Sequence, residues 1–171
     1  IDKLDIMKKL LLLLLLVPVF SFGQTADDLN NRGNAKLDNK DYYGAISDYS
    51  KAIELDPDDA YAYNNRGLAK ANLKDYYGAI NDYSKAIELK PDYVYAYNNR
   101  GLAKLILEDF YGAINDCSKV IELDSDNVLA YTVRAACKNG LNDINGACVD
   151  FRIAMSKGNT DNIEYVKNNC N

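Results

Sequence analysis

The ten-residue stretch YAYNNRGLAK occurs at Tyr61–Lys70 and again at Tyr95–Lys104, 34 positions later. The rest of the chain follows the same period. Four units align with one another, at residues 26–59, 60–93, 94–127 and 128–158. A repeat of this length predicts a row of similar units stacked side by side.

Small residues recur at two fixed places in each unit. One column of the alignment holds Gly33, Gly67, Gly101 and Ala135, and another holds Ala45, Ala79, Ala113 and Ala147. Each unit is expected to form two helices, which approach closely where these columns face each other. The second helix has an apolar face, formed in the second unit by Tyr76, Ile80, Tyr83 and Ile87. An aspartate stands just before each second helix, where its carboxylate can cap the first free amides: Asp41, Asp75, Asp109 and Asp143.

The period and the residue order Gly, Tyr, Ala, Tyr, Ala, Pro resemble the tetratricopeptide repeat (TPR) family, from residue 26 to about residue 158. The resemblance implies an all-α fold, a right-handed α-solenoid of four helix–turn–helix repeats. Residues 159–171 are expected to form a C-terminal capping helix, because Ile163, Val166 and Cys170 share one helical face. The resemblance also implies a non-catalytic protein–protein interaction module that binds a protein or peptide in its concave groove.

The first 23 residues have a different character from the repeats. Two lysines, Lys8 and Lys9, precede an apolar run at residues 10–20, and small residues follow at Ser21 and Gly23. This order is typical of a signal peptide cleaved near Gly23, and residues 1–6 precede the expected start at Met7. The run is shorter than the roughly 20 residues that span a bilayer. We therefore expect an exported protein, periplasmic or secreted, without a membrane span after cleavage.

Composition argues against several classes of function. The net charge is −5 and no strongly basic block occurs, so nucleic-acid binding is not expected. The chain has no His, the commonest general base and metal ligand. No nucleophile–base pair, phosphate-binding loop or metal-ligand spacing is present. We expect no enzymatic activity, no cofactor and no metal.

All 4 cysteines lie in the C-terminal third of the chain. In an exported protein an even number of cysteines predicts disulfides, with three possible connectivities. We expect one pair to be Cys148–Cys170, which would tie the capping helix to the last repeat. The second pair would be Cys117–Cys137. The alternative is that these residues are small buried hydrophobes with free thiols.

The chain departs from the TPR pattern in two columns. Arginine replaces the usual Leu before the Gly, at Arg32, Arg66, Arg100 and Arg134, and lysine replaces the later aromatic residue, at Lys36, Lys70, Lys104 and Lys138. The arginines could bind an acidic ligand, or they could pair with the periodic aspartates. Because a packed guanidinium needs a partner, we favour ion pairs. The family's packing implies pairs between neighbouring repeats: Asp48 with Arg66, Asp82 with Arg100, and Asp116 with Arg134.

The first helices also carry a polar face opposite the packing stripe. In the TPR family this face lines the groove, so the expected partner-binding residues are Asn30, Asn34, Tyr61, Asn64, Asn65, Tyr95, Asn98, Asn99 and Leu105. An amide both donates and accepts, so this row could satisfy the backbone of a peptide. The alternative is a solvated row of asparagines.

Some TPR proteins hold the C-terminal carboxylates of chaperones with a clamp of Lys, Asn and Arg side chains. Asn34 and Asn65 match the clamp's amides. Asn30, Tyr95 and Asn99 stand where its cations belong, so the carboxylate grip is not expected here. The alternative function is a structural or assembly subunit of a cell-envelope complex, held through its edges or its cap.

Overall fold

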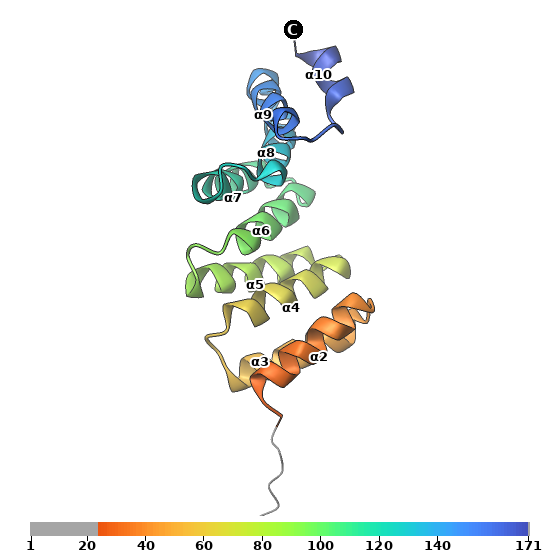
Figure 1. Ribbon diagram of the computed structural model, residues 1–171, viewed down its shortest axis with the longest axis vertical. Helices are drawn as coiled ribbons and strands as arrows, with labels where there is room; N and C mark the ends of the chain where they lie inside the picture. Colours follow the sequence, from red (N-terminus) through yellow and green to blue (C-terminus); the bar gives the residue numbers. More distant parts are fainter. Residues whose placement is uncertain (1–23, 171) are drawn as a thin grey trace, which may run out of the picture.

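A computed structural model describes residues 24–170, which form α-helices joined by short turns, with no strand in that range. The helices are α2 (Ala26–Asp38), α3 (Tyr42–Leu55), α4 (Ala60–Asn72), α5 (Tyr76–Leu89), α6 (Val94–Ile106), α7 (Phe110–Leu123), α8 (Val128–Gly140), α9 (Ile144–Ser156) and α10 (Ile163–Asn169). They stack in sequence order along the long axis of the molecule, with α2 and α3 at one end and α10 at the other (Figure 1). The expected signal peptide, residues 1–23, lies outside the described residues.

The turn inside each repeat is built the same way. In the second repeat, Lys74 adopts a left-handed conformation with φ 65° and ends α4, and the Asp75 N–H donates to the Lys70 carbonyl over 3.0 Å. The Asp75 carboxylate then accepts from Gly78 N–H at 3.0 Å and caps α5, as the sequence predicts. The equivalent left-handed residues are Lys40, Glu108 and Asn142. These turns fix the helix pairs of an all-α TPR solenoid.

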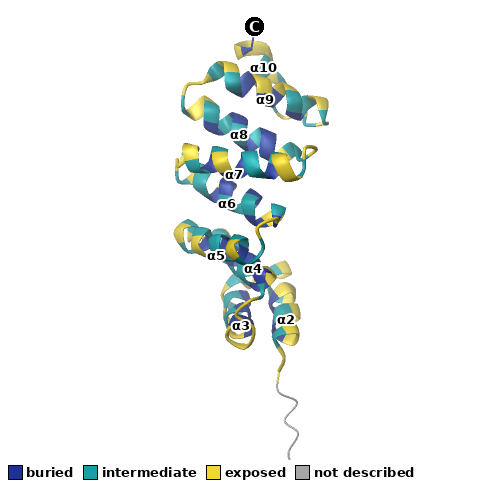
Figure 2. Ribbon diagram, turned by 90° about the vertical axis from the view of Figure 1, so that its left-hand side faces the viewer, coloured by how far each residue is buried: buried dark blue, intermediate teal, exposed yellow. Residues whose placement is uncertain are grey.

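The helices of a repeat approach most closely at the glycine column. A Cβ atom added at Gly67 would lie 2.7 Å from Tyr83 Cε1 and 3.2 Å from the Ala79 carbonyl oxygen. Tyr83 and Ala79 are both buried. The core is therefore a series of small clusters between neighbouring helices, and Figure 2 shows the buried positions inside the stack with exposed ones toward the turns.

Helix α10 covers the C-terminal end of the stack. Tyr165 packs on Phe151 of α9 with ring centroids 4.8 Å apart, and Val166 joins the same apolar cluster. Cys148 and Cys170 form a disulfide with a Cα–Cα distance of 5.5 Å, as expected. The short last helix is thus held both by packing and by a covalent bond.

The expected Cys117–Cys137 disulfide is wrong, because both thiols are free and buried. The Cys117 sulfur lies against Gly101 of its own repeat, 3.4 Å from where a Cβ would be, instead of bonding to Cys137 on α8. Both side chains belong to one apolar cluster with Val120 and Val133. Burial raises the pKa of the Cys117 thiol to about 12 and that of Cys137 to about 11. They pack as small hydrophobes.

Candidate functional site

Each repeat buries one aspartate beneath two cations. Arg66 Nε and Nη2 donate to Asp82 Oδ2 and Oδ1 at 3.0 and 2.7 Å, and Lys70 Nζ lies 2.7 Å from Oδ2. The same triad recurs as Arg32–Asp48–Lys36, Arg100–Asp116–Lys104 and Arg134–Asp150–Lys138. All four carboxylates are buried. Such burial of a charge requires paired and hydrogen-bonded partners.

The expected register of these ion pairs is wrong. Arg66 pairs with Asp82 in its own repeat and not with Asp48 of the preceding one, and Arg100 and Arg134 likewise pair with Asp116 and Asp150. The physical reason is the packing of the two helices of one repeat, which places each arginine opposite the aspartate of its own hairpin, whether a Gly or, as at Ala135, an Ala follows it.

Neighbouring repeats are linked by the third guanidinium nitrogen. Arg66 Nη1 donates to Ser50 Oγ of the preceding repeat at 3.2 Å, and its Cζ lies 5.4 Å from the Tyr63 ring centroid. Arg100 donates to Ser84 and Arg134 to Ser118 in the same way. The arginines are therefore engaged inside the stack. The serine and lysine columns went unused in the sequence-based prediction, although both recur with the repeat period.

The triads favour the ionised carboxylate. The hydrogen bond from Arg32, with a further contribution from Lys36, lowers the pKa of Asp48 to about 2. For Asp150, burial raises the pKa, but the hydrogen bonds from Arg134 and Lys138 together outweigh it and leave the pKa lowered. Both carboxylates are ionised at neutral pH.

Four asparagines of the expected binding row form a hydrogen-bonded chain across three repeats. Asn99 Nδ2 donates to Asn64 Oδ1 at 3.1 Å, and Asn64 Nδ2 donates to Asn65 Oδ1 at 3.0 Å. Asn65 Nδ2 in turn donates to Asn34 Oδ1 at 3.1 Å, and that oxygen also accepts from the Tyr49 hydroxyl at 2.7 Å. Asn64 is buried, with 5% of its surface exposed. The chain ties the first helices of the repeats to one another.

The other two asparagines of the row, Asn30 and Asn98, make no hydrogen bond to this chain. Asn98 is buried and its Oδ1 accepts no hydrogen bond, because Val133 occupies the place of the next asparagine donor. Asn30 Nδ2 donates to Asp59 Oδ2 at 2.6 Å, while its own Oδ1 is buried without a donor. Both residues therefore keep a buried amide oxygen that accepts no hydrogen bond.

We call the row formed by Tyr61, Asn64 and Leu68 on α4, with its equivalents on α2, α6 and α8, the inner face. Its exposed side chains are mostly apolar and include Tyr61 (54% exposed), Tyr95 (71%), Leu102 (40%) and Leu129 (46%). Leu105 was expected to face the groove, but it packs against the Cys117 cluster, and Ile106, one turn beyond Leu102, is 48% exposed beside the row. The inner face thus has an accessible apolar part in repeats two to four.

Two hollows lie along the inner face. The apolar hollow, of about 60 Å³, is lined by Leu68, Ala71, Tyr76, Tyr83, Leu102 and Ile106, among others. The acidic hollow, of about 550 Å³, lies where α2 and α4 begin and is lined by Asp27, Asn30, Asp56, Asp58, Asp59 and Tyr61, with Lys90 at its side. Lys90 Nζ donates to the Tyr61 hydroxyl at 2.8 Å and lies 4.8 Å from that ring's centroid.

A stack of helix pairs with an accessible inner face defines a helical-repeat interaction module. The family model described as TPR repeat matches residues 33–74 and 71–105, and the model described as tetratricopeptide repeat matches residues 94–127. The chain belongs to the tetratricopeptide repeat family. No curated protein gives a significant sequence match.

Solved TPR structures resemble this one closely. A crystal structure of MamA superposes with a TM-score of 0.76 at 25% identity, covering 78% of each chain. The first TPR domain of Spaghetti (RPAP3), bound to the HSP90 peptide SRMEEVD, gives 0.68 at 30% identity, covering 70% of this chain and 94% of that one. The Sgt2 TPR domain from Aspergillus fumigatus gives 0.65 at 26%, covering 70% and 81%. Within residues 24–170 no helix is long and apolar enough to cross a membrane.

Proposed function

We propose that the protein is a non-catalytic interaction module whose inner face binds a segment of a partner protein. The observation that carries this proposal is the set of exposed apolar side chains there, Tyr61, Tyr95, Leu102 and Ile106, beside the apolar hollow. Apolar surface left open next to a concavity favours a binding site. The TPR domain of RPAP3, which resembles this chain, is itself bound to a peptide.

We also propose that the protein works outside the reducing cytosol. The Cys148–Cys170 disulfide supports this location, because structural disulfides persist in oxidising compartments. The order of residues 1–23 is that of an export signal. Trapping the thiols with a maleimide in intact cells tests the proposal. We expect Cys148 and Cys170 to stay unlabelled until a reductant is added, and labelling without reductant would contradict it.

Crosslinking tests the inner face directly. A photo-reactive amino acid placed at Ile106 should capture a partner protein in the native cell. The double substitution Leu102→Ser/Ile106→Ser should abolish that partner's co-purification without unfolding the chain, because both side chains are substantially exposed. Retention of every partner by this variant would refute binding at the inner face.

A second candidate function is an assembly subunit held through its outer edge. A row of tyrosines at the start of the second helices favours it, since Tyr43, Tyr77 and Tyr111 are 77%, 73% and 72% exposed. The variant Tyr77→Ser/Tyr111→Ser is therefore the matched control for the inner-face substitution. If only this variant loses the partner, the outer edge is the binding surface.

A further inference from the structure

We propose that the segment bound on the inner face is basic, with Lys or Arg side chains seated in the acidic hollow and an apolar side chain in the apolar hollow. This inference rests on the function proposed above and adds the chemistry of the partner. It follows from the charges along the inner face, from the environment of Lys90, and from the positions of the two hollows.

The acidic hollow is short of positive charge. Four aspartates line it, Asp27, Asp56, Asp58 and Asp59, against the single cation Lys90. Within residues 24–170 none of these four carboxylates lies in a salt bridge. Like charges gathered around a concavity focus the field there and favour an incoming cation.

Lys90 shows how a cation sits at this hollow. Its ammonium lies 4.8 Å from the Tyr61 ring centroid and 5.2 Å from that of Tyr93. Tyrosine faces attract ammonium and guanidinium groups. The wall therefore offers aromatic faces and carboxylates, both of which suit a basic side chain.

Within residues 24–170, the first helices offer no unpaired cation to an acidic segment. The arginines and lysines of the first helices are held by the buried aspartates, as Arg66 and Lys70 are by Asp82. The RPAP3 domain, by contrast, is bound to the peptide SRMEEVD, which carries two Glu and a C-terminal Asp. A peptide of that charge would meet uncompensated aspartates here. Charge complementarity therefore favours a bound segment with positive charge.

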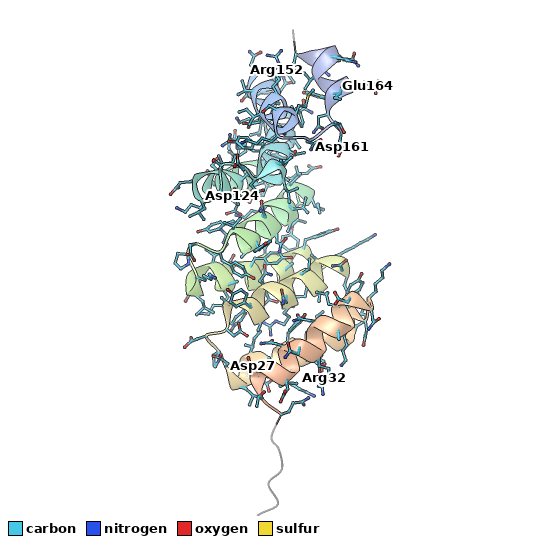
Figure 3. All side chains as sticks on the ribbon, in the orientation of Figure 1. Asp27, Arg32, Asp124, Arg152, Asp161 and Glu164 are labelled. Atoms are coloured by element: carbon cyan, nitrogen blue, oxygen red, sulfur yellow. A yellow bond between two sulfur atoms is a disulfide. The ribbon has the colours of Figure 1, made fainter. Side chains whose placement is uncertain are left out.

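A selection from phage-displayed random dodecapeptides tests the sign of the charge. The intact chain is compared with Asp27→Asn/Asp58→Asn, which removes two carboxylates of the hollow that cap no helix. The matched control is Asp161→Asn/Glu164→Gln, which removes the same charge at the opposite end of the molecule (Figure 3). Thermal unfolding followed by circular dichroism verifies that all three remain folded.

We expect peptides selected by the intact chain to be enriched in Lys and Arg and depleted in Asp and Glu. A synthetic copy of the best peptide should bind Asp27→Asn/Asp58→Asn about five- to tenfold more weakly, and bind the control variant within about twofold of the intact chain. Binding should also weaken as salt is raised. A selected pool that is acidic or without charge bias overturns the inference, as does equal weakening in the control.

Lys90→Gln gives an independent test, because this substitution should change the peptide affinity in the direction opposite to Asp27→Asn/Asp58→Asn. Removing the internal ammonium leaves the carboxylates and both tyrosine rings without a cation, so the same peptide should bind about two- to fivefold more tightly. Weaker binding by Lys90→Gln overturns the inference. If a partner crosslinks at Ile106 but proves acidic, the proposed function stands and only the charge assignment fails.

Discussion

Asp82 has 4% of its surface exposed and lies between the Arg66 guanidinium and the Lys70 ammonium. Arg66 and Lys70 stand where the TPR pattern has Leu and an aromatic residue, and each repeat has a charged triad at these positions. A buried ion pair adds little net stability over packed hydrophobes, but losing one partner is costly. The triads therefore affect the free energy of unfolding most when a substitution removes one of the three charges.

Replacing Asp82 with Asn should destabilise the protein strongly. The amide keeps the size of the carboxylate but leaves Arg66 and Lys70 without a counter-charge, which typically costs about 3–5 kcal/mol. Urea denaturation measures the change. The control is Glu88→Gln, which removes an exposed partner of Lys85 and should cost less than about 1 kcal/mol. Equal stability of the two variants would show that the triad contributes nothing.

Stability should fall in acid over a window set by Asp48. Its pKa is about 2 in the folded protein, where Arg32 and Lys36 hold the carboxylate, against about 3.9 in an unfolded chain. Because the folded pKa is the lower one, this contribution is complete above about pH 5 and is lost as the pH falls toward 2. Denaturation midpoints from pH 7 to pH 2 measure it. Asp48→Asn, already destabilised at pH 7, should show a shallower loss, and an unchanged slope would contradict the assignment.

At the scale of the helix pair, a glycine of the first helix faces the second helix of the same repeat. The second and third repeats differ in the side chain that this glycine faces. Gly67 faces the ring of buried Tyr83, whereas Gly101 faces the smaller Cys117, with its nearest neighbour 3.4 Å from an added Cβ. The same substitution therefore meets a tight site in one repeat and a roomy one in the next.

Gly67→Ala should destabilise and Gly101→Ala should not. At Gly67 the new methyl group would lie 2.7 Å from Tyr83 Cε1, an overlap that costs about 1–3 kcal/mol. At Gly101 the contact is ordinary, so the higher helix propensity of Ala, worth up to about 1 kcal/mol, should dominate. Parallel thermal melts of the two variants measure the difference. Similar effects in both repeats would show that the contact with the second helix does not decide the outcome.

The helix pairs themselves were predictable from sequence, because the period, the small columns and the Asp caps all act within one repeat. The pairing of Arg66 was not. Asp48 and Asp82 belong to the same column, so periodicity alone fits either partner, and only the packing of the two helices of one hairpin decides between them. The repeat period also predicts the inner face only in part. Periodicity placed Asn64 there, but it did not predict that the side chain is buried and accepts a hydrogen bond from Asn99 in the next repeat.

On the scale of the whole molecule, stability is distributed along the stack, because each repeat contacts chiefly its neighbours. The two ends of the described chain differ. At the first repeat the Arg32 side chain is 43% exposed, against 19% for Arg66. At the other end α10 covers the last repeat, yet this helix of 7 residues is too short to be stable by itself. Its position therefore depends on the packing of Tyr165 and on the disulfide.

Reducing the Cys148–Cys170 disulfide should loosen the molecule from this end only. The bond joins residues separated by 22 positions, and closing a loop of that length stabilises by roughly 3 kcal/mol in the chain-entropy account. Hydrogen exchange measured by mass spectrometry should show α10 losing protection first and α9 next, with α4 and α5 unchanged. Cys148→Ser/Cys170→Ser without reductant should reproduce the pattern, since the free thiols at Cys117 and Cys137 are already reduced. Equal loss of protection in α4 and α5 would instead mean that the stack unfolds as one cooperative unit. Local loss would show that the disulfide secures the last repeat alone.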